Sequence, residues 1–550
     1  MRTLSALSLP LALLLFSLTP TLAQEGNPVP VQEIDAIFDA FDGTRTPGCA
    51  VGVSLEGVPV LLRAYGMADL EHGVPNTAST VFEPGSVSKQ FTAAATVLLA
   101  LDGKISLDDD IRTYIPELPD YGDVVTIRHL MHHSSGLRDW GSVAGIEGWP
   151  RTRRAHTHMH VLDIASRQQS LNYPPGEYYS YTNTGYNLQA ILVERVSGMS
   201  FAEFSRTRIF EPLGMTRTQW RDDFMRIVPD RAMAYTRTRE GEWATLMPFE
   251  NVHGNGGLLT TAEDQLRFTR NLETGELGGP RFVEEMHRRS VLNSGQVHFY
   301  AGGLQLREYK GLPIVEHSGS TAGYRGHLAR FPDQGLAVSV TCNASTANAG
   351  ALLREVADLY LGDAAVEREP TRAQTVNLPP GRLEALAGPY RDMRRETLVR
   401  VVATDEGLRF GGSLLLPVSD RRFEGGATVL EFEAEAFADG RPSAVMSTSG
   451  ADNVRIEPVP EFQPSQSQLQ EYTGTYHSDE AEATYTVEIE HGTFVMKDRW
   501  GQGRVLQPVY PDAFTSGGNT FIFRRDPSGT VTEVSLSQGR VWDLRFKKEG

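Results

Sequence analysis

One stretch, residues 82–92, constrains the fold and the chemistry of this chain more than any other. A glycine-containing turn leads into Ser86, and an apolar, alanine-rich run over residues 91–101 is typical of a buried helix. Residues three apart lie on one face of a helix, so Ser86 and Lys89 are expected to be neighbours. A desolvated lysine can take the proton of a serine hydroxyl, and a helix start offers backbone N–H groups to an oxyanion. The stretch therefore predicts that Ser86 is a catalytic nucleophile.

The Ser-x-x-Lys spacing is a weak signal when it stands alone, because a capping serine followed by a surface lysine gives the same pattern. Two later segments carry further polar groups that a catalytic cleft could use. Tyr181 and Asn183 alternate on a loop ahead of a predicted helix, so both side chains can point the same way. His317, Ser318 and Gly319 follow a strand-like run, where a glycine often marks the close approach of another backbone.

Length and charge narrow the class of protein. A chain of 550 residues is too long for one ordinary core, so two or three domains are expected. The formal net charge of −17 argues against a nucleic-acid-binding protein, since that function needs a basic surface. Residues 1–23 have the pattern of a signal peptide: Arg2, an apolar run over residues 4–18 and a small-residue cleavage site. We therefore expect export to the periplasm or the medium, without a stable membrane anchor.

The order of predicted elements indicates an α+β domain over residues 30–362. Strands are expected near both ends of this region, including residues 50–55 and 336–341, with helices between them. The two ends should therefore meet on one antiparallel sheet. Residues 363–380 are charged and then proline-rich, and they are interpreted as a linker.

The remainder predicts two all-β units, residues 381–462 and 463–550, which form two small barrels or two halves of one. An internal repeat supports this division. Its first members, Leu383, Gly388 and Tyr390, recur 86 residues later as Leu469, Gly474 and Tyr476, and Pro417, Phe423 and Phe432 recur with an offset of 91 as Pro508, Phe514 and Phe523.

Taken together, Ser-x-x-Lys, Tyr-x-Asn and His-x-Gly occur in the order found in one enzyme family. With these motifs the chain resembles the penicillin-recognising serine hydrolases, which include class C β-lactamases, DD-peptidases, D-aminopeptidases and related esterases. Further segments resemble the same family: residues 82–86, 133–137, 175–177, 212–215, 256–258 and 261–264. The likeness covers roughly residues 30–362 and implies the β-lactamase/transpeptidase-like fold.

The resemblance also implies a mechanism that needs no cofactor. Ser86 attacks a carbonyl group and forms an acyl-enzyme, while Lys89 and Tyr181 manage its proton, with Tyr181 as the final base and later the acid. A phenolate at Tyr181 would need nearby cations, for which Lys89 and His317 are the candidates, and Lys89 and Tyr181 are treated as a coupled pair with no individual protonation states assigned. Asn183 would orient the substrate amide.

The backbone N–H groups of Ser86 and Ser320 would form the oxyanion hole.

One departure from the family bears on the substrate. β-Lactamases and DD-peptidases of this family usually carry lysine where this chain has His317, and histidine is only fractionally charged near neutral pH. D-aminopeptidases and some esterases carry His-x-Gly there, and such D-aminopeptidases also have C-terminal barrels. The expected function is therefore an exported peptidase (D-aminopeptidase or DD-carboxypeptidase-like) or esterase acting on a small or peptide substrate. A class C-type β-lactamase, a sensor that acylates without turnover, and a non-catalytic scaffold remain alternatives.

Two cysteines are present, Cys49 and Cys342, each in a strand-like run. In the family's sheet the first strand lies beside the last, so the two residues are expected to approach each other. A disulfide and two separate buried thiols both remain open.

Residues 151–160 contain several arginines and histidines and are followed by Asp163, which superficially resembles a metal site. The stretch lacks the ligand order of metallo-hydrolases and no downstream histidine cluster completes it. We expect a solvated basic loop near the cleft and no metal site. His132 and His133 are expected to be structural.

Overall fold

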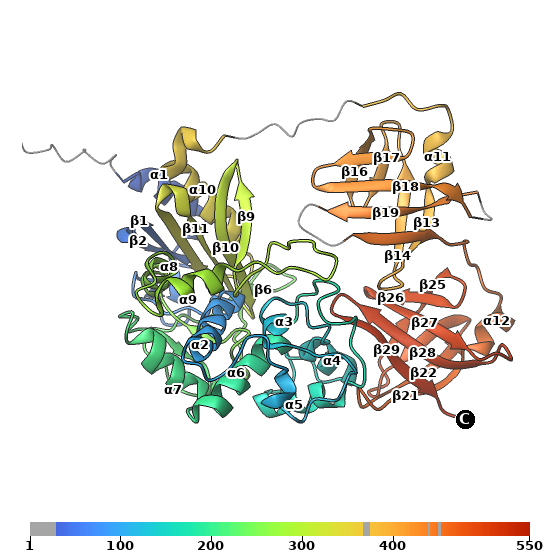
Figure 1. Ribbon diagram of the computed structural model, residues 1–550, viewed down its shortest axis with the longest axis horizontal. Coiled ribbons are helices and arrows are strands. Elements are labelled where there is room, and N and C mark those ends of the chain that lie inside the picture. Colours follow the sequence, from blue (N-terminus) through green and yellow to red (C-terminus); the bar gives the residue numbers. More distant parts are fainter. Residues whose placement is uncertain (1–28, 367–374, 438–439, 449–452) are drawn as a thin grey trace, which may run out of the picture.

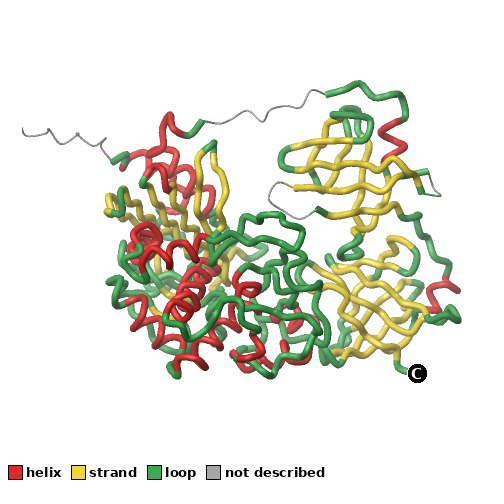
Figure 2. The backbone as a smooth tube through the Cα atoms, in the orientation of Figure 1, coloured by secondary structure: helices red, strands yellow, loops and turns green. Residues whose placement is uncertain are grey.

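The computed structural model describes residues 29–366, 375–437, 440–448 and 453–550. The predicted signal peptide, residues 1–23, and the middle of the predicted linker, residues 367–374, lie outside the described residues. The described chain forms an amino-terminal domain of sheet and helices, followed by two all-β units (Figures 1 and 2). Among the described residues, no helix has the length and apolar character needed to cross a bilayer.

A six-stranded antiparallel sheet forms the frame of the amino-terminal domain, with the strand order β2-β1-β12-β11-β10-β9. Its members are β1 (Cys49–Leu55), β2 (Val58–Tyr65), β9 (Gln305–Tyr309), β10 (Leu312–Thr321), β11 (Tyr324–Phe331) and β12 (Leu336–Cys342). The first strand of the sheet pairs with the last in sequence, since β1 lies beside β12. The α+β prediction, with both ends of the domain on one sheet, is confirmed.

Alternation along β1 explains why both faces of the sheet are covered. Val51 and Val53 pack in one core with α1 (Val31–Phe38) and α10 (Ala349–Leu361). Ala50 points the opposite way, into a cluster with Ala262 at the start of α8 (Ala262–Thr274). Successive side chains of a strand point to opposite faces, so one strand contributes to both cores.

The helical core surrounds α2 (Lys89–Leu101), which is buried over nearly its whole length. A helix that is apolar on all sides must be covered on all sides. Its neighbours include α6 (Thr184–Ser197), α7 (Phe201–Ser205) and α9 (Gly279–His287). The short helices α3 (Ile127–Met131), α4 (Trp140–Glu147) and α5 (His158–Arg167) complete this layer.

The first all-β unit is a closed barrel of eight antiparallel strands. They are β13 (Gly388–Asp392), β14 (Leu398–Ala403), β15 (Leu408–Phe410), β16 (Ser413–Pro417), β17 (Arg422–Gly425), β18 (Thr428–Ala436), β19 (Pro442–Thr448) and β20 (Val454–Pro458). The second unit is a nine-stranded antiparallel sheet. Its strands are β21 (Gly474–Ser478), β22 (Ala483–Glu490), β23 (Thr493–Lys497), β24 (Gly503–Val505), β25 (Gln507–Tyr510), β26 (Ala513–Ser516), β27 (Asn519–Arg525), β28 (Val531–Gln538) and β29 (Val541–Lys548).

The residues that the sequence repeats make matching contacts in the two units. Each unit opens with a short helix, α11 (Arg382–Leu386) or α12 (Gln466–Glu471), before its first strand. The hydroxyl of Tyr390 donates to the carbonyl four residues earlier at 2.9 Å, and that of Tyr476 does the same at 2.7 Å. The rings of the two matched phenylalanine pairs cross edge to face, with centroids 5.8 Å and 5.6 Å apart.

The second β unit shares a core with the amino-terminal domain. Trp140 and Val143 of α4 and Ile164 of α5 belong to one buried cluster with side chains of β21–β29. The hydroxyl of Tyr485 donates to the carbonyl of Ile146 at 3.0 Å. The sheet therefore packs against the amino-terminal domain, beside α4 and α5, as Figure 1 shows.

Cys49 and Cys342 are directly opposite in the β1–β12 ladder, and a disulfide joins them. Their expected approach is confirmed, and of the two states left open the structure has the disulfide. The bond links residues 293 positions apart, and it therefore fixes the strand pair that closes the amino-terminal domain.

We expect the double variant Cys49→Ala/Cys342→Ala to be less stable than the oxidised wild type by about 2–5 kcal/mol, because the bond restricts the unfolded chain. Urea unfolding, followed by tryptophan fluorescence, measures the change. Wild type kept under reducing conditions is the matched control and should unfold like the variant. Identical midpoints for oxidised wild type and the variant would contradict a stabilising role.

Candidate active site

A cleft of about 400 Å³ lies at the exposed end of β10 and the turn before α2. Seven of the eight residues predicted for the site line it: Ser86, Tyr181, Asn183, His317, Ser318, Gly319 and Ser320. The eighth, Lys89, is fully buried behind Ser86. The structure thus brings together residues from three distant segments of the chain.

Glycines allow β10 to lie directly against the turn that carries Ser86, the 3₁₀ segment η2 (Gly85–Ser88). A Cβ at Gly319 would lie 1.9 Å from the carbonyl oxygen of Pro84, and one at Gly85 would lie 2.5 Å from the backbone nitrogen of Ser320. Gly85 also has a φ of +58°. The backbone nitrogens of Ser86 and Ser320 are therefore close enough to serve one oxyanion, as the family resemblance implies.

A buried ion pair supports the same turn from behind. Glu83, which is 0% exposed, accepts from Arg221 at 2.9 Å and 3.1 Å, and Arg221 is only 1% exposed. Removing one partner of such a pair leaves an uncompensated buried charge. The pair therefore ties the residues before Ser86 to the rest of the domain.

Lys89 contacts three oxygen atoms. Its Nζ lies 3.2 Å from Ser86 Oγ, 3.0 Å from Asn183 Oδ1 and 2.6 Å from the carbonyl oxygen of Asn255. Burial, and then the charge of Arg540, hold the pKa of Lys89 well below its usual value. A neutral amine has two N–H donors and one lone pair. The amide and carbonyl oxygens can only accept, so they take both donors and leave the lone pair for the hydroxyl proton of Ser86.

Tyr181 is a phenol in this arrangement. Burial raises its pKa, while a hydrogen bond with Ser86 and the charge of Arg540 lower it. Lys89 Nζ lies 4.8 Å from the centre of its ring. Burial therefore opposes a phenolate at Tyr181 and favours the deprotonated form of Lys89.

His317 is neutral as well. It is 2% exposed, its Nε2 lies 3.0 Å from the hydroxyl of Tyr300, and its Nδ1 lies 2.6 Å from the carbonyl oxygen of Ser318. Burial is the main cause that lowers the pKa of His317 to about 3. The sequence led us to expect a fractional charge on His317 near neutral pH. The buried ring is neutral there instead, because little solvent reaches it.

His133 has the structural role expected for it. Its Nδ1 accepts from the backbone N–H of Thr182 at 3.2 Å, and its ring lies 4.2 Å from that of Tyr181 and 4.6 Å from that of Tyr300. Burial holds its pKa well below the usual value, so the ring is neutral. His133 therefore fixes the loop that carries Tyr181.

Sequence reasoning missed three residues of the cleft. Asn255 supplies the backbone carbonyl that Lys89 contacts. The family-like segment that follows it, residues 256–258, was the one feature of the sequence that pointed to this position. Arg151, expected in a solvated basic loop, lines the cleft and forms an ion pair with Glu250. Arg540 reaches the cleft from the second β unit, and no motif marks it.

The histidines of residues 156–160 do not form a common site. His156 contacts the carbonyl of Trp149, and His160 completes a capping box at the start of α5. His158 instead lies with Glu194 and His253, whose possible ligand atoms are all within 4.8 Å of one another.

Two imidazoles and a carboxylate are a ligand set that suits zinc. His253 Nε2 is buried without a hydrogen-bond partner among the described residues, whereas His158 Nε2 already lies 2.9 Å from the carbonyl oxygen of His253. These residues could hold a metal ion. This cluster of His158, Glu194 and His253 could not be predicted from local sequence, because Glu194 and His253 are far from His158 in the chain.

Comparison with known proteins gives relatives over almost the whole chain. It is 28% identical over 535 residues to a D-aminopeptidase of Gluconobacter oxydans, covering 94% of this chain and 98% of that protein. It is 28% identical over 430 residues to penicillin-binding protein 4* of Bacillus subtilis, covering 74% of this chain and 94% of the relative.

Solved structures share the fold. An octameric penicillin-binding protein homologue from Pyrococcus abyssi aligns with a TM-score of 0.54 and 23% identity, over 78% of this chain and 98% of that one. A D-amino acid amidase from Ochrobactrum anthropi aligns with a TM-score of 0.50 and 23% identity, over 60% of this chain and 97% of the other. The family model described as Beta-lactamase matches residues 34–362. The chain therefore belongs to the β-lactamase family.

Proposed function

We propose that this protein is a serine peptidase that cleaves amide bonds through an acyl-enzyme on Ser86. The observation that carries the proposal is the set of contacts around Lys89 Nζ, which holds this nitrogen 3.2 Å from Ser86 Oγ. The D-aminopeptidases among the relatives and the fold shared with a D-amino acid amidase support an amide substrate that contains a D-residue. Ester and β-lactam hydrolysis are the alternatives within the same chemistry.

The first step transfers the hydroxyl proton of Ser86 to Lys89 as Oγ attacks the substrate carbonyl. The negative charge that develops on the carbonyl oxygen is held by the N–H groups of Ser86 and Ser320. Tyr181 then donates its phenolic proton to the departing nitrogen, and Lys89 returns a proton to Tyr181. Water releases the acyl group by the reverse sequence, and the enzyme regains its starting protonation state.

The variant Ser86→Ala should abolish turnover of a D-amino-acid amide and of an activated ester, because it lacks the nucleophile. Product release and the intact mass of the protein are followed together in wild type and variant. Turnover in wild type alone supports a hydrolase. A lasting wild-type adduct without product would show a sensor that acylates only, and turnover that survives in Ser86→Ala would reject the proposal.

Lys89→Met and Tyr181→Phe should affect different steps. We expect Lys89→Met to lose about 10²- to 10⁴-fold in kcat/KM with every substrate, because it removes the general base. Tyr181→Phe should lose a similar factor with an amide, whose nitrogen must be protonated, and far less with a p-nitrophenyl ester, whose leaving group needs no proton. Equal losses with both substrates in Tyr181→Phe would instead assign the base role to Tyr181.

The ionisation of His317 should not shape activity between about pH 5 and about pH 8, because its pKa is about 3. The pKa of His317 in the folded protein is lower than the usual value of about 6.5. The folding stability that the neutral ring contributes is therefore fully present above about pH 6.5 and is lost as the pH falls through about 3. We expect pH profiles of kcat/KM with the same shape for wild type and His317→Gln. A limb near pH 6 that only wild type shows would contradict this expectation.

A further inference from the structure

The turn between β28 and β29 delivers one side chain of the second β unit into the cleft. Gly539 and Arg540 form this two-residue turn, since Gln538 pairs with Val541. Arg540 lines the same cavity as Ser86 and Tyr181, although it comes from another unit of the chain. Its guanidinium carbon lies 4.9 Å from the centre of the Tyr181 ring.

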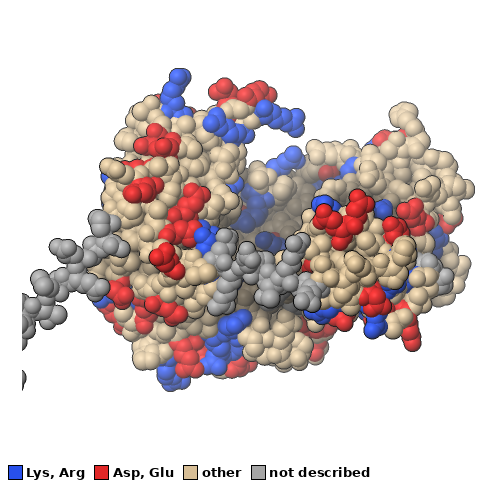
Figure 3. Space-filling view, turned by 90° about the horizontal axis from the view of Figure 1, so that it is seen from above, with Lys and Arg blue, Asp and Glu red and all other residues tan. Residues whose placement is uncertain are grey.

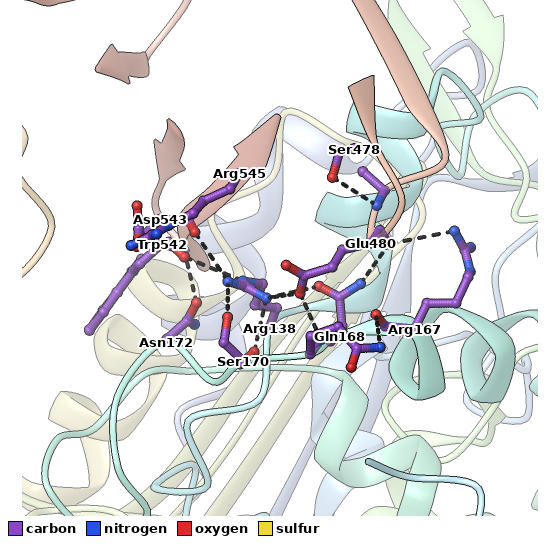
Figure 4. A network of polar contacts seen from close by, with 12 residues as sticks. Arg138, Arg167, Gln168, Ser170, Asn172, Ser478, Glu480, Trp542, Asp543 and Arg545 are labelled. Atoms are coloured by element: carbon purple, nitrogen blue, oxygen red, sulfur yellow. Dashed lines mark hydrogen bonds and ion pairs between the residues drawn. The ribbon is translucent and has the colours of Figure 1, made fainter. Parts of the chain in front are cut away.

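Polar contacts with the amino-terminal domain hold this hairpin in place (Figure 4). The carbonyl of Arg540 accepts from the backbone N–H of Asp139 and from Asn172 Nδ2, each at 3.2 Å. Asn172 Oδ1 in turn accepts from the N–H of Trp542 at 2.8 Å. The hairpin is therefore anchored to the amino-terminal domain by its backbone at Arg540 and at Trp542.

Arg138 adds a buried connection between the two parts. It is 3% exposed, donates to Glu480 Oε2 at 2.8 Å, and donates to the carbonyl oxygens of Trp542 and Asp543 at 3.3 Å. Glu480 also accepts from the backbone N–H of Gln169 at 2.8 Å. A buried, well-paired network of this kind fixes a geometry, so Arg540 has a defined position.

The side chain of Arg540 keeps its donors available for a ligand. Its guanidinium makes no hydrogen bond to any residue that the structure describes, and 43% of the side chain is exposed. The nearest carboxylate oxygen, on Asp139, is 3.8 Å away. The two groups form an ion pair at this distance, and Asp139 also accepts from the backbone N–H groups of Ser142 at 3.0 Å and Asn183 at 2.8 Å.

Arg540 is the arginine of the cleft whose hydrogen-bond donors are free. Among the residues that the structure describes, the lining of the cleft contains Arg151 and Arg540 and no Asp or Glu. Arg151 contacts both carboxylate oxygens of Glu250, one of them at 2.9 Å, so its charge is compensated. His317 is neutral near pH 7. Viewed from above, Lys and Arg side chains also gather in the hollow between the amino-terminal domain and the β units (Figure 3).

We infer that Arg540 forms an anion subsite of the cleft and selects substrates that carry a carboxylate beside the scissile bond. A planar guanidinium with free donors binds a carboxylate by two parallel hydrogen bonds, and stacking on Tyr181 holds it in the required plane. An ammonium group in the same place would be repelled. The inference rests on the proposed function of the cleft, and it assigns a binding role to the second β unit.

Paired substrates test the subsite on both sides of the scissile bond. One pair is N-acetyl-D-Ala-D-Ala and its C-terminal amide, and the other is N-succinyl- and N-acetyl-D-alanine p-nitroanilide. We expect wild type to prefer the charged member in at least one pair. Arg540→Gln should lower kcat/KM for that member by about 10- to 100-fold more than for the uncharged member, mainly by raising KM.

Arg545→Gln is the matched control, because it removes the same charge from the same hairpin at a position outside the cleft lining. It should leave both members of each pair unchanged. Equal losses for charged and uncharged members in Arg540→Gln would show that Arg540 only supports the hairpin, and this result would overturn the subsite. Unchanged ratios in both pairs would overturn it as well.

A binding measurement separates failure of the subsite from failure of the proposed function. The four compounds are titrated calorimetrically into Ser86→Ala and into Ser86→Ala/Arg540→Gln, neither of which needs to turn them over. A preference for a carboxylate that Arg540→Gln abolishes supports the subsite. Equal affinity for charged and uncharged members in Ser86→Ala contradicts it. If only the proposed role of Ser86 as nucleophile is wrong, Ser86→Ala still turns the substrates over while the carboxylate preference depends on Arg540.

Discussion

The removal of water from Lys89 is the condition on which the site depends. A lysine in solvent is an ammonium group that cannot accept a proton, whereas the same side chain without solvent favours its neutral form. The structure achieves this by placing Lys89 at the start of a helix that is covered on all sides. The oxygens of Asn183 and Asn255 then orient the amine, so that its lone pair meets Ser86. The packing that buries Lys89 is therefore also what allows it to act as a base.

The sheet meets a second requirement, which is close approach of two backbones. Gly319 in β10 lies where any side chain would collide with the carbonyl of Pro84. The strand can therefore bring the N–H of Ser320 beside the turn that carries Ser86. The disulfide between Cys49 and Cys342 closes the same sheet two strands away from β10. Cys342 pairs with Arg325 and Arg325 with Ser320, so the covalent bond lies level with the strand residue that would supply half of the oxyanion hole.

Much of this could be predicted from local sequence. The strand-like runs over residues 50–55 and 336–341 place β1 and β12 to within one residue, and the apolar run over residues 91–101 places α2 to within two residues. Ser86 and Lys89 could be found because three positions along one turn determine their distance. The partnership of Cys49 with Cys342 required knowledge of the family's sheet order, since nothing local indicates which strands pair.

The ionisation of the site could not be predicted. The pKa values of Tyr181 and His317 depend on how much water reaches them, and this depends on the whole packed domain. The place of Arg540 in the cleft could not be predicted for a related reason. The sequence of a two-residue hairpin turn does not indicate which distant surface the turn contacts. Long-range contacts of this kind are set by how units dock, and no periodicity encodes them.

Arg540 follows Ser86 by 454 positions in the chain. Ribosomes build chains from the amino terminus, so the nucleophile and its base can assemble while the last hairpin is still unmade. A nascent chain at that stage has the chemistry without the charge that the hairpin brings. The cleft therefore acquires its full electrostatic character only when the hairpin of β28 and β29 has docked.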